Sequence, residues 1–425
     1  MLSDRVTFIT KALIVVGPYL GRAAIRRVAA YGHSWTWRNT PDAKNIVVLG
    51  GSFAGTELVR GLTETLPTGN KVVWIEKHSH FNYIFNFPRY SVLKRHEQRA
   101  FIPYDFIATG APLGILTSIQ DEAIAITDAH VLLASGERID YACLAIATGS
   151  TQPLPANVSC NKRSEACREL QGAQQTIEAS PNIAVVGGGA VGVQLASDIK
   201  DFFPTKDVTL IHSRDRLMNR FGSRLQDYVL TALRDELKIR VLLNERPKLP
   251  VGGNFAQSTS LTFSDGHEEF DLVIGCIGQR PNSSLLKICY PDAISKENSR
   301  ILVRPTLQVF SATNPTKNLP IFAFGDVADH SGPRMGRAGW TQAGVVLENI
   351  LSTIQGQAAS RRYVPDIFIE GAIKLTLGKT HLVFYAVENG EHGSDFLIPS
   401  RDGKLDLEAE NAWKEYGVDF KQLWK

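Results

Sequence analysis

The stretch Gly50-Gly51-Ser52-Phe53-Ala54-Gly55 has a counterpart at Gly187-Gly188-Gly189-Ala190-Val191-Gly192. Each follows an apolar run that predicts a buried strand, and each opens a segment with helical periodicity. A glycine-rich turn between a strand and a helix can cradle the pyrophosphate of a dinucleotide. One such turn is weak evidence. Two of them, each with a further strand about 20 residues later, predict two bound dinucleotides and electron transfer between them.

The composition is typical of a globular enzyme with more than one domain. The chain has 425 residues, of which 44% are hydrophobic and 21% charged. A net charge of +3 gives no electrostatic basis for binding nucleic acid, and no metal-binding pattern is present. The five cysteines are an odd number and form no C-x-x-C pair, which argues against a disulfide framework. This favours a reducing, intracellular compartment.

Residues 1–44 form a basic, apolar segment that differs from the remainder. Between Arg5 and Asn39 the chain carries basic residues and no acid, and the apolar stretch is interrupted by Lys11 and Pro18. A membrane span needs about 20 apolar residues, so the segment is too short for one. A transit peptide, a membrane-interface anchor and simple packing against the body are the alternatives. We therefore expect a cytoplasmic protein with peripheral membrane association, or a mitochondrial one.

The order of the strands predicts a split first domain. The strand at 71–75 ends in Glu76, at the spacing from Gly55 where a carboxylate binds the hydroxyls of an adenosine ribose. A late strand at 319–326, followed by a helix at about 336–354, has no place in the second unit and should return to the first sheet. We expect five segments: residues 1–44 (N-terminal segment), 45–157 (N-terminal portion of the first domain), 158–284 (second domain), 285–360 (C-terminal portion of the first domain) and 361–425 (C-terminal domain).

Four motifs in this order resemble the two-dinucleotide flavoproteins of the glutathione-reductase fold, in the pyridine nucleotide-disulfide oxidoreductase-like family: the two glycine turns, A-T-G-S at 147–150 and F-G-D-V-A-D at 324–329. The stretches Phe87-Pro88-Arg89, 101–104 and 374–379 narrow the resemblance to fungal members of the apoptosis-inducing-factor-like branch that includes the ferroptosis suppressor. The resemblance implies an α/β fold with two Rossmann-like domains, an FAD domain split by an inserted NAD(P)H domain, and a small C-terminal α+β region.

The resemblance also implies roles for individual residues in the first domain. The first glycine turn would face the FAD pyrophosphate, Asp326 would hold a ribityl hydroxyl, and the helix starting near Gly336 would direct its N-terminus at the pyrimidine edge of the flavin. The expected FAD residues are Gly50, Gly51, Ser52, Phe53, Ala54, Gly55, Glu76, Thr148, Gly149 and Asp326.

The second unit favours NADPH over NADH. Its second strand ends in His212-Ser213-Arg214, where an NAD site would carry a carboxylate for the 2′-hydroxyl. Ser213 can donate a hydrogen bond to a 2′-phosphate and Arg214 can pair with it, although Arg214 can also be a solvated loop charge. The expected NAD(P)H residues are Gly187, Gly189, Gly192, His212, Ser213 and Arg214.

The electron acceptor is expected to be a diffusing molecule. The stretches 78–107 and 187–201 contain no cysteine, which argues against a thiol-disulfide relay. With the basic apolar segment and the family resemblance, this predicts an FAD-dependent NAD(P)H oxidoreductase acting on a quinone-like acceptor. The alternatives are a slow, redox-sensing interaction protein like apoptosis-inducing factor and a type II NADH:quinone dehydrogenase. No catalytic residue is assigned; the candidates are Lys374, Lys379, His330 and Gln194, the last standing where many relatives carry glutamate.

Overall fold

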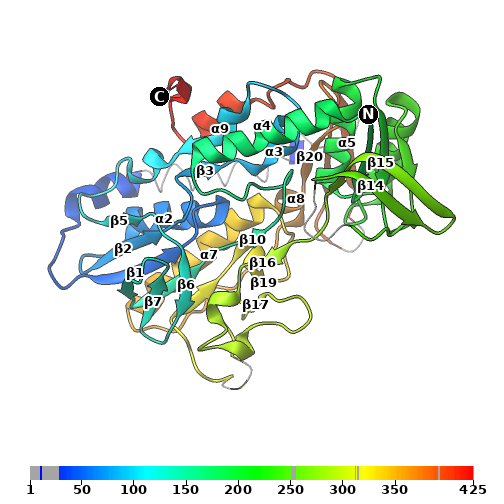
Figure 1. Ribbon diagram of the computed structural model, residues 1–425. Coiled ribbons are helices and arrows are strands. Elements are labelled where there is room, and N and C mark those ends of the chain that lie inside the picture. The colour runs from blue at the N-terminus through cyan, green and yellow to red at the C-terminus, as the bar shows by residue number, and fades with distance from the viewer. Residues whose placement is uncertain are drawn as a thin grey trace.

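The first sheet is built from strands far apart in the chain (Figure 1). The computed structural model describes residues 10–11, 28–249, 255–311, 313, 315–390 and 393–424. Its first sheet is parallel throughout, in the order β18-β9-β1-β2-β5. The strands are β1 (Lys44–Leu49), β2 (Asn70–Ile75), β5 (Leu116–Ile119), β9 (Cys143–Ile146) and β18 (Ile321–Ala323). The apolar runs of β1, β2, β9 and β18 are buried, as expected for a parallel sheet covered on both faces, whereas the edge strand β5 is partly exposed.

The late strand returns to the first sheet, as predicted. Ile321 of β18 pairs with Leu144 of β9, so the chain completes this sheet only after it has built the second one. Helix α7 (Gly336–Ile354) has the predicted bounds and packs against α2 (Phe53–Thr65). A Cβ atom on Gly339 would lie 2.9 Å from the Cβ of Ala54, so the two helices approach closely. The predicted α/β fold class is confirmed.

The second sheet has the order β13-β12-β11-β15-β14. Its strands are parallel except at one edge, where β14 and β15 form an antiparallel hairpin. Figure 1 shows this sheet (green) at the opposite side of the molecule from strands β1 and β2 of the first sheet (blue). The elements are α4 (Arg163–Ala179), β11 (Asn182–Val186), α5 (Ala190–Phe202), β12 (Asp207–Ile211), α6 (Ser223–Thr231), the π-helix η4 (Ala232–Glu236), β13 (Arg240–Leu242), β14 (Phe255–Phe263) and β15 (Gly266–Gly275).

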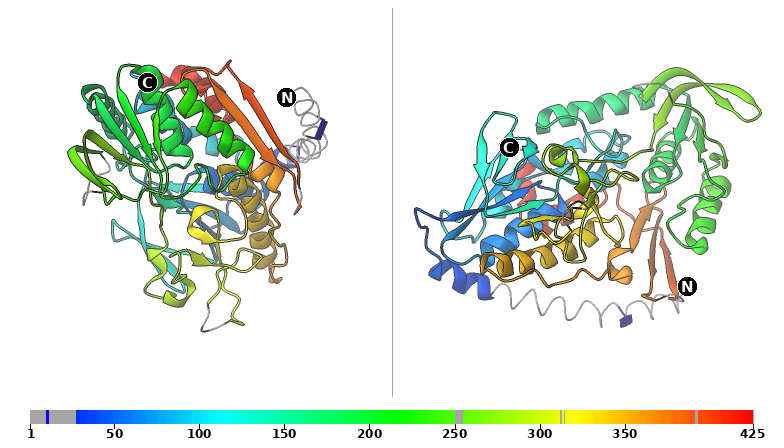
Figure 2. Two further views of the ribbon diagram at one scale, coloured as in Figure 1. Left: turned by 90° about the vertical axis from the view of Figure 1, so that its right-hand side faces the viewer. Right: turned by 90° about the horizontal axis from the view of Figure 1, so that it is seen from below.

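The C-terminal region docks on both units. Its antiparallel sheet, orange in Figure 2, lies beside α5 and shares a core with the second sheet through residues such as Leu375 and Tyr385. The tail instead joins the first core through Trp413 and Leu423. The apolar stripe Trp413, Tyr416, Phe420, Leu423 and Trp424 predicts a single final helix, but Gly417, at φ 71°, separates two short ones. The elements are α8 (Ile367–Glu370), β20 (Ile373–Thr376), β21 (Leu382–Val387), β22 (Asp395–Ser400), α9 (Ala409–Glu415) and η8 (Phe420–Trp424).

Short elements fill the connections. The chain crosses between the two units where β10 (Ser150–Thr151) pairs with β16 (Arg280–Pro281). The others are β3 (His80–Asn82), η1 (Ile84–Asn86), α3 (Phe87–Tyr90), η2 (Glu97–Ala100), β4 (Phe101–Pro103), η3 (Tyr104–Ala108), β6 (Ala123–Ile126), β7 (His130–Leu133), β8 (Arg138–Asp140), η5 (Ser284–Leu286), η6 (Pro291–Ala293), β17 (Ile301–Leu302), η7 (Gly325–Val327) and β19 (Ala328–Asp329).

The N-terminal segment is only partly described. Residues 28–36 are helical, and buried Trp37 donates a 3.3 Å hydrogen bond from Nε1 to the carbonyl of Asn70. Lys11 forms an ion pair with Glu388. The predictions for residues 1–9 and 12–27 lie outside the described residues. Within those that are described, no helix has the length and hydropathy of a membrane span.

Candidate functional site

The first glycine turn is sterically locked. Gly50 has φ 103°, and a Cβ atom there would lie 2.3 Å from the carbonyl oxygen of Ala147, at the end of β9. A Cβ on Gly55 would lie 2.1 Å from the carbonyl oxygen of Gly50. Ser52 is the N-cap residue of α2, and within the described residues its side chain makes no capping hydrogen bond. The backbone N–H groups at the start of α2 are therefore available to bind an anion.

Glu76 lies against this turn, where the sequence predicts it. Its Oε2 accepts a hydrogen bond from the backbone N–H of Gly51, and its Oε1 accepts one from the backbone N–H of His78 at 2.7 Å. The hydroxyl of Tyr104 donates to the carbonyl of Gly51 at 2.8 Å. Sequence reasoning missed Tyr104 as a site residue, although it ends the 101–104 motif. Contact of Glu76 with an adenosine ribose stays a prediction.

The loop 147–150 lies between the first glycine turn and Asp326, another predicted FAD residue. Thr148 Oγ1 donates to the carbonyl of Asn282 at 2.9 Å, and Asn282 Nδ2 donates back to the carbonyl of Thr148 at 2.8 Å. Ser150 Oγ donates to Asp326 Oδ2 at 3.4 Å. Asn282 ends the turn-rich stretch 278–282, and the sequence predicts no binding role for it. The structure thus brings Thr148, Gly149 and Asp326 to one side of the first sheet.

A buried amide supports the Gly-Asp turn. Gln342 of α7 is fully buried, and its Oε1 accepts a hydrogen bond of 2.7 Å from the backbone N–H of Gly325. Its Nε2 lies 3.2 Å from Nε2 of His330. Burial, with a smaller contribution from Arg334, lowers the pKa of His330 to about 3. His330 is therefore neutral near pH 7, and it holds no extra proton to donate there.

The start of α7 meets the start of α2. A Cβ on Gly336 would lie 3.3 Å from Cγ of Phe53, and the N-cap residue Met335 makes no side-chain capping bond within the described chain. Two helix N-termini thus converge beside the first glycine turn, and both favour negative charge. The two helix starts are suited to hold the diphosphate of an FAD and the electron-rich edge of its flavin ring.

The second glycine turn repeats the steric logic. Gly187 has φ 130°, and a Cβ there would lie 2.5 Å from the carbonyl oxygen of Cys276. A Cβ on Gly192 would lie 1.8 Å from the carbonyl oxygen of Gly187. Gly189 differs, because in the described structure no atom stands within 4 Å of its missing side chain. The turn is therefore closed toward the sheet and open at the start of α5, as a bound pyrophosphate requires.

The His212-Ser213-Arg214 segment follows β12 beside this turn. Nδ1 of His212 accepts a 3.1 Å hydrogen bond from the backbone N–H of Gly188, which places the imidazole proton on Nε2. Burial, then the charge of Arg214, lowers the pKa of His212, so it adds no positive charge. Ser213 and Arg214 are exposed, and within the described residues the Arg214 side chain has no ion pair. Binding of a 2′-phosphate by Arg214 stays a prediction.

The catalytic candidates lie in different surroundings. Lys374 forms a 2.8 Å ion pair with Glu408, and Lys379 Nζ lies 5.0 Å from the ring centroid of Phe202. Gln194 lies in α5, just after the second turn, and its Nε2 is buried without a partner among the described residues. Of these three candidates, Gln194 is the one with an uncommitted polar group beside a predicted nucleotide site.

The cysteines offer no redox pair. All five lie within the described residues, and all are free. Burial raises the pKa of Cys143 and of Cys276 to about 12, and the pKa of Cys167 to about 11. A thiolate is the reactive form of cysteine, so these thiols are poor nucleophiles near neutral pH.

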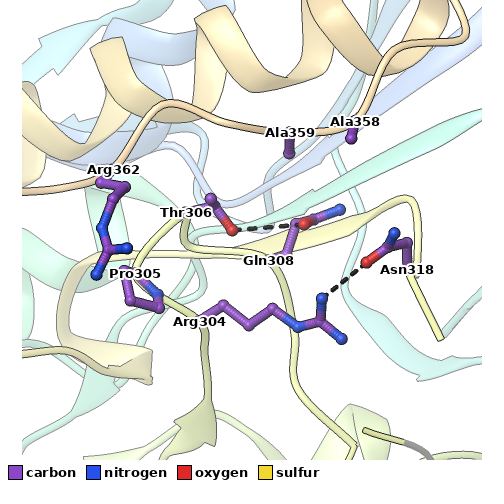
Figure 3. A pocket seen from close by; sticks show the side chains of 8 residues that line it. All are labelled: Arg304, Pro305, Thr306, Gln308, Asn318, Ala358, Ala359 and Arg362. Carbon is purple, nitrogen blue, oxygen red and sulfur yellow. Dashed lines mark hydrogen bonds between the residues drawn. The ribbon is translucent and has the colours of Figure 1, made fainter. Parts of the chain in front are cut away.

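A separate surface pocket lies beneath the segment that follows α7 (Figure 3). It has a volume of about 190 Å³, and its lining includes two arginines, Arg304 and Arg362. Arg304 is already committed, because its guanidinium donates to Asn318 Oδ1 at 2.7 Å and to the carbonyl of Pro315 at 2.6 Å. We assign no ligand to this pocket.

Comparison with known proteins agrees with this geometry. The chain belongs to the pyridine nucleotide-disulphide oxidoreductase family, which it matches over residues 44–345. It is similar to Fe-regulated protein 8 of Mycosarcoma maydis, with 33% identity over 421 residues, covering 90% of this chain and 97% of that protein. It is also similar to ferroptosis suppressor protein 1 of Xenopus tropicalis, with 26% identity over 390 residues, covering 88% and 96%.

Among solved structures, the fold resembles the sulfide:quinone oxidoreductase of Aquifex aeolicus, with a TM-score of 0.69 and 18% identity, covering 88% of this chain and 90% of that one. The predicted family and its branch are confirmed. The chain is thus a member of a family of flavin-dependent oxidoreductases that bind FAD and NAD(P)H.

Proposed function

We propose that this protein is an FAD-dependent NAD(P)H oxidoreductase that passes electrons to a quinone-like acceptor. The observation that carries the proposal is the pair of glycine turns, each packed too tightly against its sheet for a side chain at the first and last glycine, and each followed by a helix start without a side-chain cap among the described residues. Bound FAD would supply the two-electron chemistry, taking a hydride from the nicotinamide and delivering electrons onward. The role of the chain is to bind, orient and shield the two dinucleotides.

We assign the binding roles as the sequence predicts them. Gly50, Ser52 and Gly55 would hold the FAD pyrophosphate, Glu76 the adenosine ribose and Asp326 a ribityl hydroxyl. On the other side, the 187–192 turn would hold the NADPH pyrophosphate. Ser213 and Arg214 would bind the 2′-phosphate. The buried Nε2–H of neutral His212 has no acceptor among the described residues.

The free cysteines and the neutral His330 both support a quinone-like acceptor. The free, weakly acidic cysteines argue against a disulfide acceptor. Neutral His330 argues against a dedicated acid donor at that position, and a quinone can take its protons from solvent. The assignment requires neither Lys374 nor Lys379 as a catalytic group.

We also propose that the helical segment 28–36 lies at a membrane surface, cytoplasmic or mitochondrial. Val28, Tyr31 and Trp35 share one face of it and are 75%, 68% and 67% exposed. Exposed tyrosine and tryptophan are typical of the membrane interface, and the surrounding sequence is basic. Replacing Tyr31 and Trp35 with serine should lower sedimentation with vesicles containing anionic lipid by about tenfold, the effect of roughly 1.4 kcal/mol. Equal sedimentation of both proteins would contradict this placement.

The function is tested by turnover. Purified protein, saturated with FAD, is mixed with NADPH and a water-soluble short-chain quinone, and NADPH oxidation is followed. Rapid multiple cycles are expected. A single slow bleaching of the flavin would instead support a redox-sensing interaction protein, and a strong preference for NADH would support a type II dehydrogenase. A preparation that never binds FAD would overturn all three.

A further inference from the structure

Arg89, in the Phe87-Pro88-Arg89 motif, is completely buried at a junction of three regions of the molecule. Its Nε donates to Oδ2 of Asp198 at 2.8 Å, and both side chains are fully shielded from solvent. Its Nη2 donates to the carbonyl of Gly378 at 2.6 Å, and its Nη1 to the carbonyl of Leu405 at 3.0 Å. One guanidinium therefore ties α3 of the first domain to α5 of the second and to two turns of the C-terminal region.

The neighbouring contacts close the same junction. The backbone N–H of Lys379 donates to Asp201 Oδ2 at 2.6 Å, which holds the turn after β20 against the end of α5. Gly378 has φ 96°, and a Cβ there would lie 2.5 Å from Asp201 Oδ2. The Arg89 guanidinium lies 5.5 Å from the ring centroid of Phe202. The positive φ and this close approach both favour glycine at 378.

The buried ion pair between Arg89 and Asp198 is not explained by stability alone. Taking two charges out of water carries a desolvation penalty that the attraction between them often only just offsets. Burial raises the pKa of Asp198 even beside Arg89, and its Oδ1 has no partner among the described residues. A buried ion pair of this kind is better suited to fixing one geometry than to adding stability.

Asp198 connects the junction to the nucleotide site. It lies four residues after Gln194, on the same face of α5, and α5 begins at the second glycine turn. Gln194, with its uncommitted amide, and the start of α5 therefore move with Asp198 as one rigid helix. We infer that Arg89 is a positioning residue, whose guanidinium sets how the nucleotide-binding end of α5 faces the first domain. The inference rests on the proposed function, since it concerns transfer of hydride between the two domains.

The test uses Arg89→Lys and the nearly isosteric Asp198→Asn in the FAD-loaded protein. Lysine keeps the charge but cannot reach all the acceptors. The limiting rate of flavin reduction by NADPH should fall about tenfold or more, because misplacement by about 1 Å is costly for transfer. The Kd for NADPH and the rate of light-driven flavin reduction with EDTA should stay unchanged. In the apoprotein, hydrogen exchange should quicken at residues 377–379 and at the end of α5.

Arg99→Lys is the matched control. Arg99 pairs with Asp406 at 2.6 Å and links the first domain to the C-terminal region without a described contact to α5. It should keep the wild-type rate. Wild-type rates in both junction variants, or equal losses in the control, would overturn the positioning role. A wild-type protein that binds FAD but is never reduced by NADPH would overturn the proposed function instead, while hydrogen exchange would still test the junction.

Discussion

Replacing Gly55 with alanine is expected to yield a protein that purifies without FAD. The new Cβ would lie 2.1 Å from the carbonyl oxygen of Gly50, so either the turn or the start of α2 must move. Displacing two N–H donors to an anion costs about 3 kcal/mol. FAD affinity should therefore fall on the order of 100-fold. Flavin absorbance per mole of protein, before and after reconstitution, measures the loss.

Gly172→Ala is the control for this change. Gly172 is exposed in α4, and in the described structure nothing stands within 4 Å of its missing side chain. Its alanine variant should stay fully yellow. The Gly55 variant should still bind NADPH through the second domain, which would show that the protein folds. Full FAD retention by the Gly55 variant would refute the assignment of the first turn to FAD.

Reversing the charge of Arg214 should change the nucleotide preference. Arg214→Glu would place a carboxylate where a 2′-phosphate is expected and where an NAD enzyme uses an acid for the ribose 2′-hydroxyl. Losing a charged pair with phosphate costs about 2 to 3 kcal/mol, and NADH lacks that phosphate. The ratio of kcat/KM for NADPH to that for NADH should fall about 100-fold. Steady-state kinetics with both nucleotides measure it.

Arg216→Glu makes the same change of charge two residues further on. Arg216 already pairs with Asp227 at 3.2 Å on the exposed surface, where such a pair adds little stability. The ratio of kcat/KM values should therefore change far less in this variant. An equal shift in both variants would indicate a general electrostatic effect rather than recognition of the phosphate by Arg214.

Local signals in the sequence were sufficient for the main elements. The glycine turns and the apolar runs before them predicted two parallel sheets. The return of β18 to the first sheet could be predicted because a further buried strand had no partner nearby in the sequence. Glu76 could be placed because it ends the strand beside the first turn. These features depend on residues close together in the chain or on the simple rules of parallel sheets.

Contacts between distant segments could not be predicted in the same way. Tyr104 reaches Gly51, and Gln342 reaches Gly325, through packing that no local pattern encodes. The final helix was predicted as one because its apolar stripe continues through Gly417, but the positive φ there breaks it. The Phe-Pro-Arg motif marked the branch of the family, while its place at a three-way junction emerged only from the fold.

The return of β18 also has a consequence for the order in which the chain can fold during synthesis. Strand β9 has β1 on one side and β18 on the other, and β18 lies beyond the whole second domain in the sequence. The ribosome therefore completes every strand of the second sheet while one edge of β9 still lacks its neighbour. The domain that begins first is the last whose sheet can close.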